Sequence, residues 1–138
     1  MSFSFSLPST FPFLLVILIE LPPSILFLFK PDGQFPVVEP QARAVIRQYA
    51  LLLHTVNLIA LVCCIRPVDE TSRLIAGAMS LYQVGPSIRA AIRLGRGEKW
   101  LGGSLGGPLV HLVVHVICLA SLSRLFAGAD LVKRLVRA

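Results

Sequence analysis

The amino-acid sequence predicts an all-α, polytopic membrane protein, a bundle of four transmembrane helices with a kinked first helix. The chain of 138 residues contains four apolar runs near the length that crosses a bilayer as a helix, about 20 residues. Apolar residues make up 55% of it and charged residues 14%, whereas soluble domains have roughly 45–50% and 25%. Its mean hydropathy is +0.78. A soluble domain of this size cannot bury so much hydrocarbon, so residues 1–138 are predicted to form one integral membrane domain.

The four apolar runs occupy residues 7–29, 44–65, 74–94 and 105–126. Each is predicted to be a helix, because backbone groups in lipid must form hydrogen bonds within their own segment. Short connectors with turn-forming residues separate the runs: Lys30-Pro31-Asp32-Gly33, Arg66-Pro67-Val68-Asp69-Glu70 and Gly95-Arg96-Gly97-Glu98-Lys99. Asp69 is the predicted N-cap of the third helix. In the basic C-terminal tail, 127–138, a short amphipathic helix is expected on an anionic lipid surface.

The first run is expected to be a retained anchor rather than a cleaved signal, since no Lys or Arg precedes it and no Ala-x-Ala-like site follows it. Glu20 lies in the middle of this run, and Pro22-Pro23 follow. The prolines remove two amide donors, so the helix should kink or split into two half-helices there. The segment 32–41 is expected to be an ordered surface loop.

The distribution of charge argues against nucleic acid as a partner, but it does not show which way the chain is oriented in the membrane. In a four-helix topology six cations lie on one side of the membrane and seven on the other. Nucleic-acid binding is not expected, because the cations flank apolar runs without an aromatic platform or recognition motif. The three cysteines are expected to be buried thiols rather than a disulfide framework.

Polar residues inside the apolar runs are the best candidates for function, because a polar group at membrane depth is costly unless it is paired or hydrated. In the second run, His54 and Asn57 lie three residues apart on one helical face. A histidine there can accept, donate or shuttle a proton near neutral pH. An interhelical hydrogen bond that only fixes packing is an equally good interpretation.

The third run places Tyr82, Arg89 and Arg93 on one face, with Gln83 beside them. Gly85-Pro86 interrupts the helical hydrogen bonds just before Arg89. Arg89 is expected to orient an anionic or strongly polarised oxygen. The alternative is that both arginines reach the lipid headgroups, and for Arg93 this alternative is preferred.

In the fourth run, His111 and His115 lie four residues apart on one face. Bundle packing, a proton-handling pair and a metal site are the three interpretations, with packing preferred. A metal site is the least favoured, because Leu112 stands where a zinc protease keeps its glutamate and no third ligand is evident. No metal and no cofactor are therefore predicted.

Two acids complete the candidates. Glu20 is the only acid inside an apolar run, and burial favours its neutral form unless a cation such as Arg89 or a protonated histidine meets it. A functional role is preferred for Glu20. Asp69 and Glu70 lie at a helix start, where capping alone explains an acid, and capping is preferred over catalysis for Asp69.

Several reaction classes lack their motifs in this sequence. It has no phosphate-cradling loop, no dinucleotide fingerprint and no haem-attachment cysteine pair. A channel or an inverted-repeat transporter is poorly supported, because no helix carries a repeated polar stripe and the chain is short. Acid–base chemistry on a lipophilic substrate, or no chemistry at all, remains.

Short motifs follow the leading apolar helix in a fixed order: Phe29-Lys30-Pro31-Asp32-Gly33, Arg47-Gln48-Tyr49-Ala50, Arg66-Pro67-Val68-Asp69-Glu70, Tyr82-Gln83-Val84-Gly85-Pro86, and Gly107-Pro108 with His111 and His115. Over about residues 11–126 this order resembles small four-helix membrane proteins of fungal polyketide gene clusters, most of all the hydrolase-type members of citreoviridin- and aurovertin-like pathways. The resemblance implies opening of a polyketide epoxide, by water or an internal hydroxyl, to build an oxygen heterocycle. It assigns no catalytic residue.

Epoxide opening needs an acid and a base. The predicted catalytic candidates are Glu20, His54, Asp69, Tyr82, His111 and His115, and the predicted substrate-binding residues are Asn57, Gln83 and Arg89. A histidine is expected to act as base and Tyr82 or a protonated acid as donor, in a cavity between the helices.

The rival interpretation is a non-catalytic membrane protein, either a scaffold for partner enzymes or a small transporter subunit. A lipophilic small molecule and the bilayer are the expected partners, and a homo-oligomer or partner biosynthetic enzymes remain open. The expected location is the endoplasmic reticulum membrane.

Overall fold

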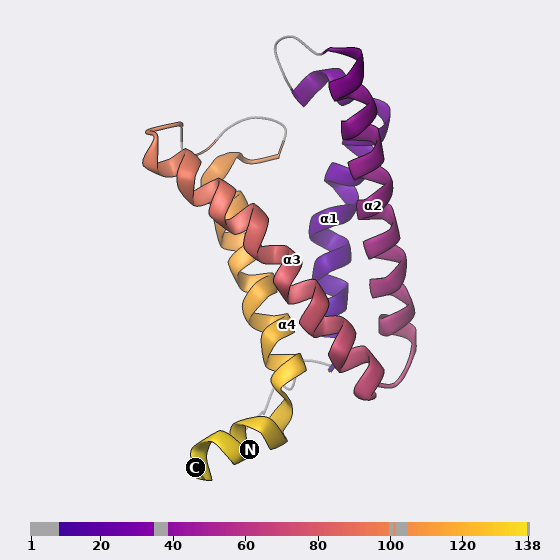
Figure 1. Ribbon diagram of the computed structural model, residues 1–138, viewed down its shortest axis with the longest axis vertical. Coiled ribbons are helices and arrows are strands. Elements are labelled where there is room, and N and C mark those ends of the chain that lie inside the picture. Colours follow the sequence, from indigo (N-terminus) through magenta and orange to yellow (C-terminus); the bar gives the residue numbers. More distant parts are fainter. Residues whose placement is uncertain (1–8, 35–38, 100, 102–104, 138) are drawn as a thin grey trace, which may run out of the picture.

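The fold consists of four long helices and one short 3₁₀ helix. A computed structural model describes residues 9–34, 39–99, 101 and 105–137. The elements are α1 (Phe11–Phe29), η1 (Pro31–Gln34), α2 (Pro40–Ile65), α3 (Glu70–Gly95) and α4 (Gly107–Arg137) (Figure 1). The all-α class predicted from the sequence is confirmed, and each predicted run coincides with one of the long helices.

The first residues of the helices explain where they begin. Pro12 is the second residue of α1 and Pro40 the first residue of α2, positions where a missing amide proton breaks no helical hydrogen bond. At the start of α3 the Asp69 carboxylate accepts a hydrogen bond from the Ser72 amide, and the Ser72 hydroxyl accepts one from the Asp69 amide, both at 2.8 Å. This capping box confirms Asp69 as the N-cap of α3.

Asp69→Ala is expected to lower the unfolding temperature in detergent at neutral pH. The hydrogen bond from the Ser72 amide holds the pKa of Asp69 below its usual value. A carboxylate whose pKa is lowered in the folded state stabilises the fold above its unfolded-state pKa, and this contribution is lost as the pH falls through the folded-state pKa. The two unfolding temperatures should therefore converge on acidification.

Asp69→Asn serves as the matched control, because it keeps an acceptor for the Ser72 amide without a carboxylate. At neutral pH its unfolding temperature should be closer to that of the native chain than the unfolding temperature of Asp69→Ala is. A difference in unfolding temperature between Asp69→Ala and the native chain that stays constant down to the most acidic pH would contradict the role of Asp69 as the cap.

α1 continues as one helix through Pro22 and Pro23. The predicted split into two half-helices is therefore wrong, while a bend at the prolines stays a prediction. After α1, η1 occupies the start of the predicted loop, and residues 35–38 of the loop lie outside the described residues. The last two residues of that loop, 40 and 41, belong to α2, so the helix begins earlier than predicted. Arg43 Nε meets Asp32 Oδ1 at 2.7 Å, which ties the described part of the loop to α2.

The helices pack as two antiparallel pairs, α1 with α2 and α3 with α4, and α1 also contacts α4. Figure 1 shows the pairs close together at the lower end and diverging at the upper end. Side chains from all four helices form the core at the close end: Phe13, Val16, Ala60, Cys63, Ala76, Met79, Cys118 and Leu122. Gly77 allows close packing of α3 on α4, because a Cβ atom there would lie 2.7 Å from Cδ2 of Phe126.

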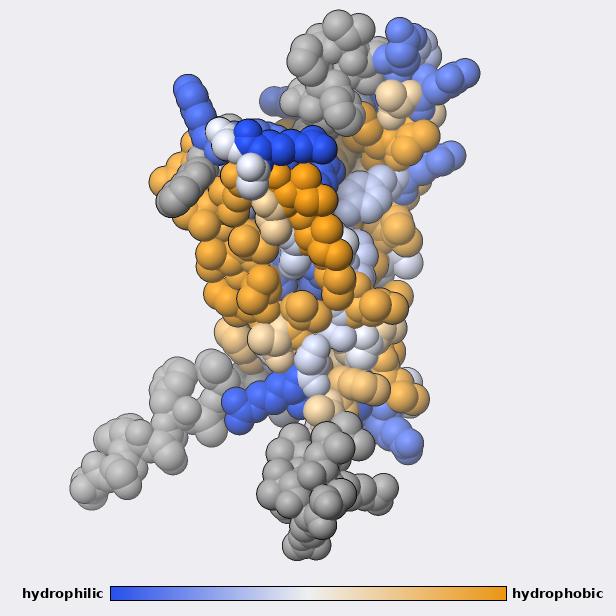
Figure 2. All heavy atoms as spheres, turned by 60° about the vertical axis from the view of Figure 1, so that its left-hand side comes forward, coloured by the Kyte–Doolittle hydropathy of each residue, from blue (hydrophilic) through white to orange (hydrophobic). Residues whose placement is uncertain are grey.

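The exterior of the bundle indicates a membrane protein. α1, α2 and the segment Gly107–Gly128 of α4 are long and apolar enough to cross a bilayer. Large apolar side chains project outward, among them Leu18 and Leu58, each 63% exposed. Figure 2 shows apolar groups over the middle of the molecule and charged groups gathered at its two ends. By the same measure of length and apolar composition, α3 is not among the helices that could cross a bilayer.

α4 changes direction near its end. Gly128 interrupts the helix with φ 59° and ψ 168°, a conformation that glycine adopts readily. Figure 1 shows the segment beyond Gly128 turned away from the axis of α4. The break coincides with the predicted start of the basic tail, and the side chains that would make that tail amphipathic lie outside the described residues.

Candidate functional site

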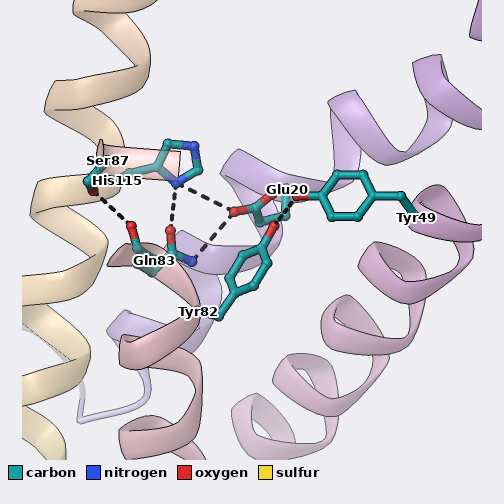
Figure 3. A network of polar contacts seen from close by, with 6 residues as sticks. All are labelled: Glu20, Tyr49, Tyr82, Gln83, Ser87 and His115. Carbon is teal, nitrogen blue, oxygen red and sulfur yellow. Dashed lines mark hydrogen bonds and ion pairs between the residues drawn. The ribbon is translucent and has the colours of Figure 1, made fainter. Parts of the chain in front are cut away.

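Polar side chains of α1, α3 and α4 meet inside the bundle, and a tyrosine of α2 that is 38% exposed joins them from the surface. Glu20 of α1, Gln83 of α3 and His115 of α4 are 3%, 0% and 5% exposed. Tyr49 of α2 and Tyr82 of α3 adjoin them (Figure 3). We call these five residues the polar cluster. The structure thus brings together four of the predicted site residues, Glu20, Tyr82, Gln83 and His115.

Helical spacing places the polar cluster on the same inward faces as the apolar core. Glu20 follows Val16 by four residues and Gln83 follows Met79 by four, so each lies about one turn beyond a core residue. His115 lies on the buried face of α4. The packing that buries the core therefore also takes these polar groups away from water and lipid.

A proline interrupts the backbone hydrogen bonds of α3 next to the cluster. Pro86 lies inside the helix and has no amide proton for the carbonyl of Tyr82, four residues earlier. The hydroxyl of the next residue, Ser87, donates to the carbonyl oxygen of Gln83 at 2.8 Å. This stretch of α3 is therefore rich in polar groups at the level of the cluster (Figure 3).

Gln83 bridges an acid and a base. Its Oε1 accepts a hydrogen bond from Nδ1 of His115 at 2.6 Å, and its Nε2 donates to Oε1 of Glu20 at 3.5 Å. Nδ1 of His115 and Oε1 of Glu20 are 3.6 Å apart. An amide oxygen only accepts hydrogen bonds, so Nδ1 carries the proton. In a neutral His115 the basic atom is therefore Nε2.

The two tyrosines extend the cluster toward α2. Their hydroxyl oxygens are 2.8 Å apart, and the Tyr82 hydroxyl lies next to the Glu20 carboxyl (Figure 3). The ring of Phe27 packs beside that of Tyr49, with centroids 6.1 Å apart. When Tyr49 donates to Tyr82, the proton of Tyr82 is left to donate elsewhere.

Two predicted histidines bond within their own helices. Nδ1 of His54 donates to the Ala50 carbonyl and Nδ1 of His111 to the Gly107 carbonyl, each at 2.9 Å. The His111 ring nevertheless lies near the cluster, with its centroid 6.0 Å from that of His115. His54 has no hydrogen bond to the cluster in the described part of the chain.

Asn57, Arg89 and Asp69 lie outside the cluster. Asn57 is 6% exposed, and neither of its amide atoms has a hydrogen-bond partner among the described residues. Arg89 lines a groove on the outward side of α3, and Asp69 caps that helix. Of the two cations expected to meet Glu20, the structure therefore provides a histidine rather than Arg89.

Sequence reasoning missed Tyr49 as a member of the polar cluster, and Ser87, which bonds the Gln83 carbonyl beside it. Tyr49 belongs to the motif Arg47-Gln48-Tyr49-Ala50, but nothing in the sequence of α2 alone marks it as a neighbour of α3. The available signal was antiparallel pairing, which sets the end of α1 beside the first half of α2 and so places Phe27 next to Tyr49.

Acid–base groups are the reactive chemistry of this site. Within the part of the chain that the structure describes, no three His, Cys, Asp or Glu side chains are grouped to hold a metal ion. No protein family, curated protein or solved structure matches the chain. The resemblance to proteins of fungal polyketide clusters therefore stays a prediction, and function must be argued from the polar cluster.

Proposed function

We propose that this chain is a membrane-embedded hydrolase- or cyclase-type enzyme that opens an epoxide on a lipophilic polyketide intermediate by acid–base catalysis. The observation that carries the proposal is the meeting of Glu20 and His115 at Gln83 inside the bundle. Burying a carboxyl and an imidazole in a span is costly, and proton transfer gives both a use. The polyketide class of substrate rests on the resemblance of the motifs alone.

In the proposed reaction, water or a hydroxyl of the substrate attacks an epoxide carbon, the carbon–oxygen bond breaks, and the released oxygen takes a proton. Nε2 of His115 removes the proton of the attacking group, while Glu20 balances the charge of the imidazolium that forms. Tyr82, whose hydroxyl is held by Tyr49, donates the proton to the epoxide oxygen. The proton then passes from Nε2 of His115 to the Tyr82 oxygen through a product hydroxyl or a water, which restores the Nδ1-protonated form of His115, so the cycle needs no cofactor.

The proposal includes a four-span topology. α3 packs along α4, whose segment Gly107–Gly128 is itself a candidate span. Gln83 and Ser87 lower the hydropathy of α3, yet both are buried in the bundle. Its outward face carries Leu81 and Ile88, which are 74% and 55% exposed. A polar interior and an apolar exterior suit a helix in lipid. We place the bundle in the endoplasmic reticulum, with a kink of α1 at its two prolines.

The test measures turnover of a lipophilic polyene epoxide by the purified chain in lipid nanodiscs, with products identified by mass spectrometry. His115→Gln and Glu20→Gln are each expected to lower the rate by about a hundredfold or more, the usual contribution of a general acid or base. His54→Gln is the matched control, since His54 bonds its own helix and its variant should turn over near the native rate. Native rates in both cluster variants would refute the proposal.

The rival function is a non-catalytic scaffold or transporter subunit, and one observation favours it. The groove on the outward side of α3 does not border Glu20, Gln83 or His115. In this case the cluster would only join the two helix pairs. Deleting the gene in its host separates the two functions, because an enzyme predicts an accumulating epoxide, whereas an unchanged metabolite profile favours the rival.

A further inference from the structure

A groove with a volume of about 430 Å³ opens along the outward side of α3, near the end that leads to α4. We call it the arginine groove, and it is lined by Gly85, Ile88, Arg89, Ile92, Arg93, Arg96 and Glu98. None of the residues of the polar cluster lines it. The groove is thus a separate feature from the acid–base site.

The arginine groove carries an excess of positive charge. Arg89, Arg93 and Arg96 follow one another at steps of four and three residues, which places them along one side of the helix. Arg93 Nε pairs with Oε2 of Glu98, the one carboxylate in the lining, at 2.7 Å. Among the described residues no ion pair joins Arg89 or Arg96 to a carboxylate. Two guanidinium groups are left for an anion with several acceptor oxygens, such as a phosphate.

The deeper part of the groove is apolar and open. Ile88 and Ile92 are 55% and 50% exposed. A Cβ atom at Gly85 would meet no atom within 4 Å, so nothing fills the deep end. From Gly85 to Arg96 the helix rises by about 16 Å, which is close to half of the roughly 30 Å hydrocarbon core. The groove therefore matches one leaflet, with charge at its outer end and hydrocarbon below.

The guanidinium group of Arg89 is the charge in the groove that an anion would stabilise most. The Cα–Cβ bonds of a helix tilt toward its N-terminus, and for the last turns of α3 this direction leads back toward the middle of the helix. Arg89 therefore starts pointing into the apolar depth rather than toward the headgroups. A phosphate bound between Arg89 and Arg96 would compensate this charge more directly than water at the membrane surface.

We propose that the arginine groove binds an anionic phospholipid. Its phosphate lies between Arg89 and Arg96, and one acyl chain follows Ile92 and Ile88 toward Gly85. The proposal requires only that α3 lies in a membrane, and it does not depend on the acid–base function of the polar cluster.

The test compares two lipids with the same acyl chains, dioleoylphosphatidylglycerol and dioleoylphosphatidylcholine, added to the purified full chain in detergent. Binding is followed by native mass spectrometry and by the rise in unfolding temperature. The anionic lipid is expected to bind about tenfold more tightly, as one charge-assisted contact would provide. Arg89→Gln should remove most of this preference. Gly85→Leu should weaken binding of both lipids, since it fills the deep end without a clash.

Arg47→Gln is the matched control. It removes the same charge from the exposed surface of α2 at the same end of the bundle, outside the groove, and should keep the lipid preference. An equal loss in Arg47→Gln would show a general effect of charge and overturn the proposal, as would equal binding of the two lipids by the native chain. Glycerol phosphate, which lacks acyl chains, should not reproduce the stabilisation, and if it does, the site binds free phosphate and not a lipid.

Discussion

Gln83→Leu is expected to lower the free energy of unfolding by about 3 kcal/mol. Gln83 is fully buried, accepts the hydrogen bond of His115 Nδ1 and donates one to Glu20 Oε1. Leucine fills a similar volume but offers neither group. Both partners then lose a hydrogen bond where water does not reach, and each such loss costs about 1–3 kcal/mol. Reversible unfolding in mixed micelles measures the change.

The triple variant Glu20→Leu, Gln83→Leu, His115→Leu is expected to recover most of that stability. Buried polar groups that are replaced together leave few unsatisfied partners, so the whole set can be exchanged for hydrocarbon at small net cost. Ser87→Ala is the control, since it removes only a hydrogen bond to the Gln83 carbonyl of the same helix and should change stability little. A triple variant that loses the sum of the three single losses would contradict this account.

Recovery of stability without recovery of turnover would separate folding from function. A cluster that contributes little net stability has no structural reason to contain a carboxyl, an amide and an imidazole at the centre of a membrane bundle. Its retention would then be explained by proton transfer, as we propose. Non-additive losses of this kind are what a connected network predicts and independent contacts do not.

The helices were predictable because their causes are local. Length and hydropathy mark a span wherever it occurs, and the cap of α3 depends on Asp69 and Ser72, three residues apart. The prolines of α1 were harder to judge. Pro22 and Pro23 remove amide donors, but the helix continues through them, so the packed environment outweighs a local preference for a break.

The site was only partly predictable, because its contacts join helices that are distant in the sequence. Spacing shows which residues share a face, and it grouped Tyr82 with Arg89 and Arg93, whereas the structure places Tyr82 in the polar cluster and both arginines in the groove. It does not show which helix that face meets. His54 and His115 look alike as partners of Glu20 in the sequence, yet His54 bonds the Ala50 carbonyl and only His115 reaches the carboxyl.

Leu81→Arg is expected to oppose membrane insertion of α3 by about 3 kcal/mol, the penalty of a charge near the centre of a transmembrane helix. Leu81 is 74% exposed near the middle of α3. The cap at Asp69 is about 18 Å away along the helix and Gly95 about 21 Å, so an arginine side chain cannot reach either surface easily. On a helix in water the same exposed substitution would change stability by no more than about 0.5 kcal/mol.

Leu101→Arg is the control, because Leu101 is 63% exposed but lies after α3, outside the helices. The integrated fraction of each variant is measured with glycosylation tags in microsomal membranes, and equal integration of both would contradict a spanning α3.

The outcome of this experiment also decides the membrane topology of the chain. Figure 1 places the start of α1 and the Gly128 end of α4 at the same end of the bundle, an arrangement that an even number of crossings gives. In the proposed four-span topology α3 is the fourth crossing beside α1, α2 and α4, and the arginine groove then faces a single leaflet on the opposite side.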